Sequence, residues 1–344
     1  MSLDTYGRIA SLELEVASWR LERRETAVSS GFTRVTTTVV LVGRGHEGCG
    51  EDVTYDAEDH DGFPTLDCTG RLTIESCCGL LEDVDLFPAK PPAREVSRAY
   101  RRWAIESAAL DLALRQAGLS LGEAVGRLYR PVRFVVSTRL DPRVWLAVDP
   151  SLEFKLDPTS EWDRVFMEAL ASTGRVRVLD FKAYYTGTIV DQAPDPGLYR
   201  AARELFPDAV IEDAALTDGT REALRGAEAR LSWDAPIHSL ADVDALAIAP
   251  RFLNIKQSRF GSLESLFETI DACEERGIVM YGGGQFELGV GRGQLQALAS
   301  LFYADAPNDV APGEYNAPEP LPGLPRSPLA PPARPAGFSW ESLA

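Results

Sequence analysis

The run Val176-Arg177-Val178-Leu179-Asp180 is short, is rich in branched apolar residues and ends in a carboxylate. Four more apolar runs in the second half of the chain also end in a charged residue, so that five charges recur at intervals of 22 to 32 residues: Lys155, Asp180, Glu212, Asp234 and Lys256. In a β/α barrel the carboxyl ends of the parallel strands meet at one mouth, so the pattern predicts that the five charges share a site. Three acids between two lysines are typical of a hard divalent cation flanked by bases.

The same alternation of apolar strands and helices extends over the whole second half of the chain. Helices are expected between the strands at residues 162–172, 198–206, 218–229, 240–247, 263–276 and 292–302. Such alternation implies parallel strands with right-handed crossovers. Further apolar runs at residues 134–136, 278–281 and 309–310 raise the count to eight strands, the number that a closed barrel needs. We therefore predict an α/β fold with a barrel domain over residues 131–316.

The first 130 residues have a different pattern and predict a separate α+β domain, a meander followed by helices. Residues 9–16 partly alternate and residues 34–42 are dense in β-branched side chains, which predicts strands. The glycine-rich residues 43–52 are expected to be a loop before a short apolar run at 53–55. Helices are expected at residues 97–114 and 120–125.

The last 28 residues, 317–344, are rich in proline, with eight prolines between Pro318 and Pro335. Proline at this density is typical of an extended strap or a mobile tail, and we expect a disordered tail.

Charge and cysteine content exclude several classes of function. The formal net charge of −17 argues against nucleic acid and anionic membrane surfaces as partners, because binding a polyanion needs a basic face. No signal-peptide pattern or membrane-length apolar run is evident. The five cysteines are odd in number and unpatterned, which favours free thiols in a reducing compartment. We expect a cytoplasmic enzyme.

Placed on this frame, the five charges resemble the active-site pattern of the enolase superfamily, in particular its muconate-cycloisomerase-like branch (mandelate racemase/muconate lactonizing enzyme). Members of that family carry a lysine on the second barrel strand, carboxylates on the third, fourth and fifth, and a lysine on the sixth. Residues 102–112 resemble the helix that joins the capping domain to the barrel, and residues 254–263 resemble the sixth-strand signature. The resemblance implies a modified (β/α)7β TIM-type barrel with an N-terminal α+β capping domain.

The resemblance also implies a chemistry. Asp180, Glu212 and Asp234 would hold one Mg²⁺, and the Mg²⁺ would stabilise the enediolate formed when a small-molecule carboxylate loses its α-proton. Lys155 and Lys256 would be the acid and base, which requires that the site lower a lysine pKa from its ordinary value near 10.4. Racemisation or epimerisation, cycloisomerisation and syn-elimination all stay open. A homo-oligomer is compatible with the family.

Two departures from the family pattern concern cations. The second-strand motif Lys-x-Lys reads Glu153-Phe154-Lys155, and the third-strand motif Asp-x-Asn reads Asp180-Phe181-Lys182. Strand periodicity points Lys182 to the same face as Asp180, so Lys182 is a candidate to supply the missing cation to the substrate carboxylate. A rival register takes Lys182 as the second-strand lysine and Glu212 or Asp213 as the third-strand acid.

Further substrate contacts are expected in loops. The glycine-rich residues 281–293 resemble the segment of the family that contacts the substrate, and Gln285 and Glu287 are its candidates. In the capping domain, the loops near residues 29–33 and 51–55 supply the candidates Phe32, Asp52 and Tyr55. Two other classes of function remain, a catalytically inactive barrel that binds a partner, and an aldolase with a Schiff-base lysine.

Overall fold

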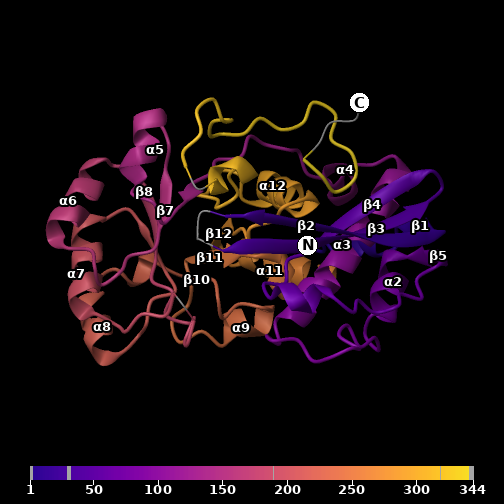
Figure 1. The fold of residues 1–344 in the computed structure, drawn as a ribbon, viewed down its shortest axis with the longest axis horizontal. Coiled ribbons are helices and arrows are strands. Elements are labelled where there is room, and N and C mark those ends of the chain that lie inside the picture. The colour runs from indigo at the N-terminus through magenta and orange to yellow at the C-terminus, as the bar shows by residue number, and fades with distance from the viewer. Residues whose placement is uncertain (1–2, 29–31, 189, 318, 341–344) are drawn as a thin grey trace.

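The computed structural model describes residues 3–28, 32–188, 190–317 and 319–340, and within them the strands form three sheets. A seven-stranded sheet has the order β12-β11-β10-β9-β8-β7-β6, a three-stranded sheet has the order β2-β3-β4, and β1 pairs with β5. Figure 1 shows the strands of the large sheet on one side of the molecule and the three-stranded sheet on the other. The structure therefore has a barrel region and a capping region.

Every strand of the large sheet runs parallel to its neighbours and follows them in sequence order, which confirms the α/β barrel prediction. The elements of this region are β6 (Val136–Ser137), α5 (Pro142–Val148), β7 (Phe154–Leu156), α6 (Arg164–Ser172), β8 (Val176–Asp180), α7 (Pro196–Leu205), β9 (Val210–Glu212), α8 (Asp218–Ala223), η2 (Glu228–Arg230), β10 (Leu231–Trp233), α9 (Leu240–Asp244), β11 (Phe252–Ile255), α10 (Gln257–Phe260), α11 (Leu263–Glu275), β12 (Val279–Gly282), α12 (Val290–Phe302) and η3 (Gly313–Asn316).

The eighth strand expected at residues 309–310 is wrong as a strand, although the chain closes the barrel there. Asn308 bridges to Phe134 beside β6, and Asp309 bridges to Gly283 at the end of β12, both in the parallel sense. Proline residues at 307 and 312 flank this segment, and proline lacks the backbone donor that a longer ladder would need. The result is a barrel of seven strands whose last position consists of two isolated bridges.

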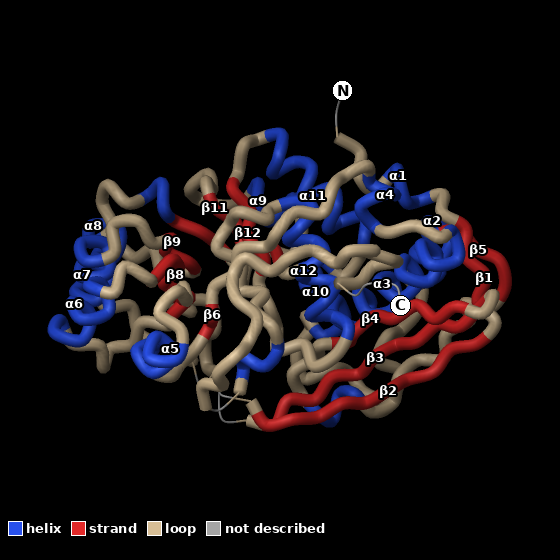
Figure 2. The backbone as a smooth tube through the Cα atoms, turned by 90° about the horizontal axis from the view of Figure 1, so that it is seen from above, coloured by secondary structure: helices blue, strands red, loops and turns tan. Residues whose placement is uncertain are grey.

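The capping region combines an antiparallel sheet with one long helix. Its elements are α1 (Gly7–Ala10), β1 (Glu13–Val16), β2 (Ser18–Ala27), β3 (Thr33–Gly43), β4 (His46–Asp52), η1 (Ala57–His60), β5 (Gly70–Thr73), α2 (Ile74–Leu80), α3 (Ser97–Ala117) and α4 (Leu121–Val125). Figure 2 shows β2, β3 and β4 side by side at the end of the molecule away from β8 and β9. Glu106 of α3 accepts a hydrogen bond from the backbone N–H of Leu263 at 2.8 Å, which connects the cap helix to the barrel.

The loop expected at residues 43–52 is wrong, because most of this segment is strand β4. Its glycines serve close packing and only Gly45 serves the turn, with a φ of 76°. A β-carbon at Gly50 would lie 2.0 Å from the Ala104 carbonyl oxygen, and one at Gly48 would lie 2.4 Å from the Ala108 carbonyl oxygen. The absence of side chains at these two positions therefore lets helix α3 lie directly on the sheet.

Two other expectations for the cap need correction. The run at residues 9–16, expected to be strand, contains the end of helix α1 before strand β1 begins, and the run at residues 53–55 follows strand β4 directly and not a loop. The sequence pattern also missed β2, whose ten residues are mostly exposed and charged. Such an edge strand has little apolar alternation to detect, because neither of its faces is fully covered.

The expectation of a disordered C-terminal tail is wrong for residues 319–340, which form an ordered strap, drawn in yellow in Figure 1. Leu329 and Val132 exchange two backbone hydrogen bonds of 2.8 and 2.9 Å. Phe338 is 1% exposed and packs edge-on against Trp103, with ring centroids 6.1 Å apart. Apolar side chains between the prolines anchor the strap to the core. Proline also favours the ordered strap, because it leaves the unfolded segment fewer conformations to lose on folding.

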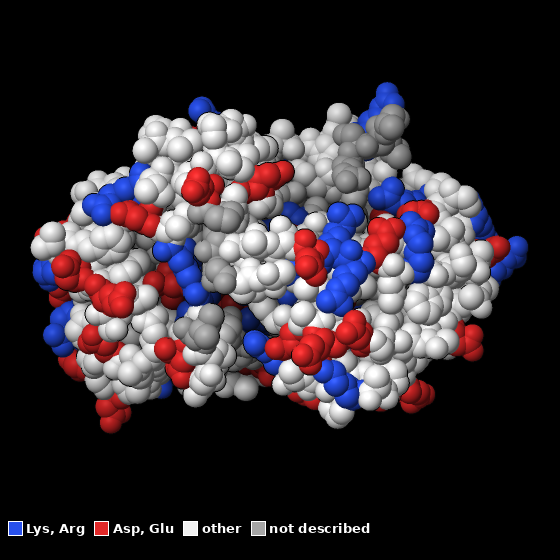
Figure 3. All heavy atoms as spheres, viewed as in Figure 1, with Lys and Arg blue, Asp and Glu red and all other residues white. Residues whose placement is uncertain are grey.

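Acidic and basic side chains are interspersed over the face shown in Figure 3. Within the residues that the structure describes, none of the helices is both long enough and apolar enough to cross a membrane. The five cysteines are free thiols, as expected. The domain boundaries at residues 130 and 316 stay predictions.

Candidate active site

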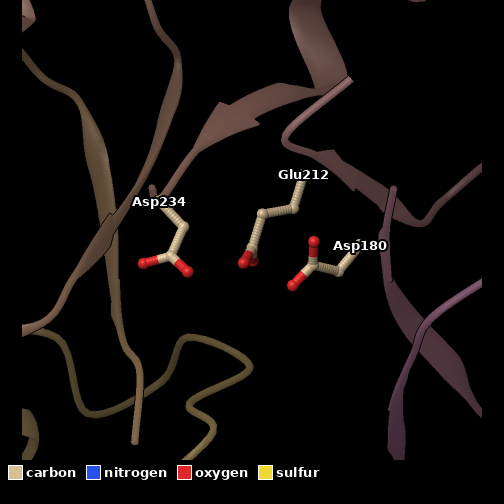
Figure 4. A group of neighbouring side chains, drawn as sticks. All are labelled: Asp180, Glu212 and Asp234. Carbon is tan, nitrogen blue, oxygen red and sulfur yellow. The ribbon is translucent and has the colours of Figure 1, made fainter. Parts of the chain in front are cut away.

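The three predicted metal-ligating acids lie side by side at the carboxyl ends of neighbouring strands. Asp180 ends β8 and pairs in register with Glu212, the last residue of β9, and Asp234 directly follows β10. One carboxylate oxygen from each acid lies within 4.8 Å of the others, and all three residues are buried. Figure 4 shows the three carboxylates in a row, facing a common space. Because parallel strands in register end at the same level, strand pairing alone brings these acids together.

The two predicted catalytic lysines flank this row. Lys155 lies on β7, with its Nζ 2.5 Å from Glu212 Oε1 and 3.1 Å from Asp180 Oδ2. Lys256 follows β11, with its Nζ 2.8 Å from Asp234 Oδ2. β7 is the second strand of the sheet and β8 is the third, which agrees with the first register and not with its rival. The structure thus brings all five charges together, and their catalytic and metal-binding roles stay predictions.

The Asp180 end of the row carries a second lysine. Lys182 follows β8 with a left-handed φ of 54°, its Nζ contacts Asp180 Oδ2, and its backbone N–H donates to Asp180 Oδ1 at 3.1 Å. The Lys182 Nζ also lies 3.7 Å from Asp157 Oδ1. By contrast Glu153, the departure on the second strand, pairs with Arg133 and Arg177 at 2.7 Å each. Lys182 therefore reaches the acids, whereas the side chain of Glu153 is engaged elsewhere.

The Asp234 end holds two residues that sequence reasoning missed. Arg259 of α10 donates from Nη1 to Asp234 Oδ1 at 3.0 Å and from Nη2 to the Tyr185 hydroxyl at 2.9 Å. The Tyr185 hydroxyl in turn donates to Asp234 Oδ2 at 3.3 Å. Arg259 lies one helical turn after Lys256, a spacing that could have identified it. Tyr185 lies in a loop, where no periodic signal exists.

Glu212, in the middle of the row, is held by neutral groups as well as by Lys155. Tyr281 donates its hydroxyl to Glu212 Oε2 at 2.5 Å, and Asn254 donates its amide to Oε1 at 3.2 Å. Asp213, the next residue along the chain, accepts the backbone N–H groups of Asp234 and Ala235 at 2.8 and 3.0 Å. Asp213 therefore positions the following strand end, a role that the rival register did not foresee.

The charges shift one another's pKa in opposite directions. Burial would raise the pKa of Asp180, but the ammonium groups of Lys182 and Lys155 outweigh it and hold this pKa far below its ordinary value. Arg259 and Lys256 lower the pKa of Asp234 in the same way. Burial and the neighbouring acids raise the pKa of Glu212 to about 8, despite Lys155. At neutral pH the two ends of the row are therefore ionised more completely than the middle.

The expected lowering of the lysine pKa is not provided by the protein groups alone. Burial lowers the pKa of Lys155, but the facing carboxylates of Glu212 and Asp180 outweigh burial and raise the pKa well above its ordinary value. The pKa of Lys256 is also raised, because Asp234 outweighs the effect of burial.

The loop after β12 contains the candidates Gln285 and Glu287. Gln285 is 1% exposed; its Oε1 accepts from Ser258, and its Nε2 has no hydrogen-bond partner among the described residues. Glu287 accepts the backbone N–H of Gln285 at 2.7 Å and pairs with Arg292 at 2.9 Å. Gln285 therefore has a free buried donor for a ligand, whereas Glu287 holds its own loop in shape.

Residues of the capping region pack against the loop after β12 and form hydrogen bonds with it. Phe32 packs edge-on against Phe286 with ring centroids 5.7 Å apart, and the Arg34 guanidinium lies 4.5 Å from the Tyr55 ring centroid. Arg34 also donates to backbone carbonyls on both sides of the junction, those of Val53, Thr54, Gln285 and Phe286. Glu51 accepts from the N–H groups of Leu288, Gly289 and Gly291. Phe32 and Tyr55 thus belong to the contact between cap and barrel, and Asp52 pairs with Arg101 at 3.0 Å inside the cap.

The donor set fits a hard divalent cation. Three carboxylates from three strands converge, and oxygen ligands suit Mg²⁺ or Ca²⁺, whereas zinc sites in proteins are richer in nitrogen and sulfur. Asp180, Glu212 and Asp234 can therefore hold one divalent cation at the mouth of the barrel.

Comparison with known proteins agrees with this geometry. Residues 128–317 match the family model "Domain of unknown function (DUF8230) C-terminal domain", and residues 7–124 match the N-terminal domain of the same family. An o-succinylbenzoate synthase of Geobacillus stearothermophilus is 25% identical over 300 residues, covering 78% of this chain and 74% of the relative. An N-succinylamino acid racemase of Amycolatopsis sp. is 28% identical over 297 residues, covering 79% and 76%.

Solved structures share the fold. A member of the enolase superfamily from Enterococcus faecalis V583 superposes with a TM-score of 0.65 at 20% identity, covering 95% of both chains. The muconate lactonizing enzyme of Pseudomonas putida superposes with a TM-score of 0.62 at 18% identity, covering 86% of this chain and 88% of that one. The chain therefore belongs to the DUF8230 family and is an enzyme of the enolase superfamily, an isomerase or lyase of its muconate-cycloisomerase-like branch.

Proposed function

We propose that this protein removes the proton α to the carboxylate of a small-molecule substrate, with Lys155 and Lys256 as acid and base and with one Mg²⁺ held by Asp180, Glu212 and Asp234. The observation that carries the proposal is the order of the site. Two lysines stand at opposite ends of three buried carboxylates whose ligand atoms lie within 4.8 Å of one another. An ordinary network of surface ion pairs would neither be buried in this way nor follow the barrel strands one by one.

When bound, the cation supplies Lewis-acid stabilisation of the negative charge that develops on the substrate carboxylate. The residues of the chain do the proton transfer. A lysine acts as base only when its Nζ is neutral, and the charges of Glu212 and Asp180 now oppose that state at Lys155. Neutralising those two carboxylates removes the attraction and leaves burial to lower the pKa of Lys155.

The placement of the lysines sets the range of reactions. Lys155 contacts Glu212 and Asp180, and Lys256 contacts Asp234, so the two ammonium groups face different parts of the acidic row and would reach a substrate held there from different directions. Two active bases permit racemisation or epimerisation, and one base with a spectator ammonium permits cycloisomerisation or syn-elimination. The relatives include a synthase and a racemase, which supports both outcomes for this arrangement.

The substrate carboxylate needs a protein partner in addition to the cation. We assign that role to Lys182, because Glu153 on the second strand pairs with Arg133 and Arg177. The unpartnered Nε2 of Gln285 offers a second, neutral donor on the other side of the mouth.

The experiment that tests this proposal is proton NMR of a carboxylate library in deuterated water with Mg²⁺. We expect deuterium to enter the carbon next to a carboxylate, and we expect Lys155→Ala or Lys256→Ala to slow this exchange by at least about 100-fold, the usual contribution of a general base. Lys90→Ala is the matched control, because Lys90 is half exposed and pairs with Glu58 and Asp59 in the cap.

A different result would favour the other class of function. Absence of exchange for every library member, together with no Mg²⁺ binding by calorimetry, would favour a catalytically inactive barrel that serves as a binding or scaffold protein. Trapping of a substrate by borohydride on Lys155 or Lys256 would instead indicate a Schiff-base enzyme.

A further inference from the structure

Lysine is scarce in this chain and concentrated at the site. Only four of the 35 basic Lys and Arg residues are lysines, and three of these place their Nζ atoms against the acidic row: Lys155, Lys182 and Lys256. Elsewhere the chain builds buried ion pairs with arginine, as between Arg101 and Asp52. Arginine is a planar fork that holds a carboxylate in fixed geometry, whereas an ammonium is a compact charge on a flexible stem. The three lysines at the site therefore carry their charge on flexible stems that can change position.

Of the three, Lys182 blocks a predicted metal ligand most completely. Its backbone N–H occupies Asp180 Oδ1 at 3.1 Å, and its Nζ occupies Oδ2, the oxygen that the Lys155 Nζ also approaches at 3.1 Å. Mg²⁺ binds carboxylate oxygens at about 2.1 Å, so a dication on Oδ2 would lie against the Lys182 ammonium. Like charges at that distance repel strongly in a buried site, so the ammonium and the cation compete for Asp180.

Lys182 is also the lysine with room to leave. Its side chain is 15% exposed, compared with 2% for Lys155 and 8% for Lys256. A second carboxylate is already within reach, because Asp157 Oδ1 lies 3.7 Å from the Lys182 Nζ. The other oxygen of this carboxylate, Oδ2, lies 3.6 Å from Arg139 Nε. The ammonium can thus swing toward the mouth without losing all of its acidic neighbours.

We propose that Lys182 is a displaceable cation that couples metal binding to substrate binding. It neutralises Asp180 in the metal-free protein, and the arriving cation releases it to contact the substrate carboxylate. This inference rests on the proposed function, because it requires the metal site. Coupling between two ligands is reciprocal, so a carboxylate that captures the freed ammonium tightens metal binding by the same factor.

The first test is calorimetric titration with Mg²⁺ alone. Replacing the ammonium by a neutral side chain of similar length removes the competitor, so Lys182→Met should bind Mg²⁺ at least about fivefold more tightly than the wild type, the lower end of ordinary coupling. The matched control Lys90→Met should bind Mg²⁺ as the wild type does. Unchanged or weaker binding by a folded Lys182→Met protein would overturn the inference.

The second test observes the motion directly. Protein carrying [ε-¹³C]lysine gives four lysine signals, which the Lys→Met variants assign. Saturating Mg²⁺ should shift and sharpen the Lys182 signal, as expected of a released side chain, and leave the Lys90 signal unchanged. A Lys182 signal that does not move while calorimetry shows bound Mg²⁺ would overturn this inference alone. Absence of Mg²⁺ binding in both the wild type and Lys182→Met would overturn the metal site and, with it, this inference.

Discussion

Asp180 and Asp234 stand at the two ends of the same acidic row, yet they are held by different means. At Asp234, the guanidinium of Arg259 contacts one carboxylate oxygen and is itself held by the Tyr185 hydroxyl, while the Lys256 ammonium contacts the other oxygen. At Asp180, both charged partners are flexible ammonium groups, those of Lys155 and Lys182. One end of the site therefore combines a rigid guanidinium with an ammonium, whereas the other end depends on ammonium groups alone and is more adaptable.

The largest expected effect is the loss of folding stability when a positively charged side chain is removed from either end of the acidic row. Arg259→Ala removes a buried guanidinium from Asp234 and leaves Lys256 as its charged partner. It should destabilise the protein by about 3 kcal/mol, because both Asp234 and the Tyr185 hydroxyl lose a charged hydrogen-bond donor. Lys182→Met leaves Lys155 on Asp180 and should change the free energy of unfolding by less than about 1 kcal/mol. Denaturant unfolding of the metal-free proteins measures both values. Equal costs at the two ends would refute the contrast between a rigid and an adaptable end.

The pKa of the middle acid sharpens the comparison. Both ends are ionised, but the pKa of Glu212 is raised from its ordinary 4.5 to about 8, so below this pH the folded protein keeps a proton that the metal must expel. Mg²⁺ affinity should therefore rise with pH, by up to about tenfold per unit below pH 8, and level off above it. Calorimetry in buffers of different ionisation heat should detect release of about one proton at about pH 7.

The sign of the stability effect follows from the same shift. A folded pKa above the unfolded one means that the folded state binds more protons, so the contribution of Glu212 to stability is complete below about pH 4.5 and is lost as pH rises toward 8. Glu212→Gln cannot titrate, so this variant should show neither the proton release nor this loss. Identical pH profiles for wild type and variant would place the titrating proton elsewhere.

The smallest expected effect tests the support behind the rigid end. Tyr185→Phe removes the hydroxyl that accepts from Arg259 and donates to Asp234, which should destabilise the metal-free protein by about 1 kcal/mol. Tyr184→Phe, one residue earlier, is the matched control. Tyr184 is 45% exposed and its hydroxyl forms a hydrogen bond with Trp233 and not with the acidic row, so this change should cost less than Tyr185→Phe. Equal stability of Tyr185→Phe and wild type would show that Arg259 needs no phenol to hold its position.

The sequence predicted the barrel and the grouping of the five charges because both follow from strand geometry. Each parallel strand ends at the same mouth as its neighbours, so a charge at the end of each apolar run is placed without knowledge of any tertiary contact. Arg259 and Tyr185 escaped this reasoning, since they lie beyond the strand ends, Arg259 in helix α10 and Tyr185 in a loop, where strand geometry does not set the direction of a side chain. Lys182 also lies beyond the end of its strand, and its left-handed φ of 54° occurs together with the hydrogen bond from its backbone N–H to Asp180.

The errors in the cap and the tail have a common cause. The glycines at 48 and 50 were predicted to lie in a loop because glycine is conformationally free. In the structure they lie in a strand, where helix α3 packs so closely that no side chain fits. The prolines near the C-terminus were interpreted by their local stiffness, but Trp103 decides where Phe338 lies. In each case a tertiary contact with a distant residue outweighed the local conformational preference. The local sequence pattern does not show which distant residue will make that contact.

The strap has a consequence for the order in which parts of the protein mature. Phe338 covers Trp103 of α3, and Asp111 of the same helix accepts the Phe338 N–H at 2.7 Å, so the core around this helix includes a residue made 227 positions after Asp111. N-terminal regions usually fold first as a chain leaves the ribosome, but here the cap stays incomplete until the strap has emerged. A ribosome that stalls between the barrel and the strap would therefore hold a chain with all five site charges and an unfinished cap.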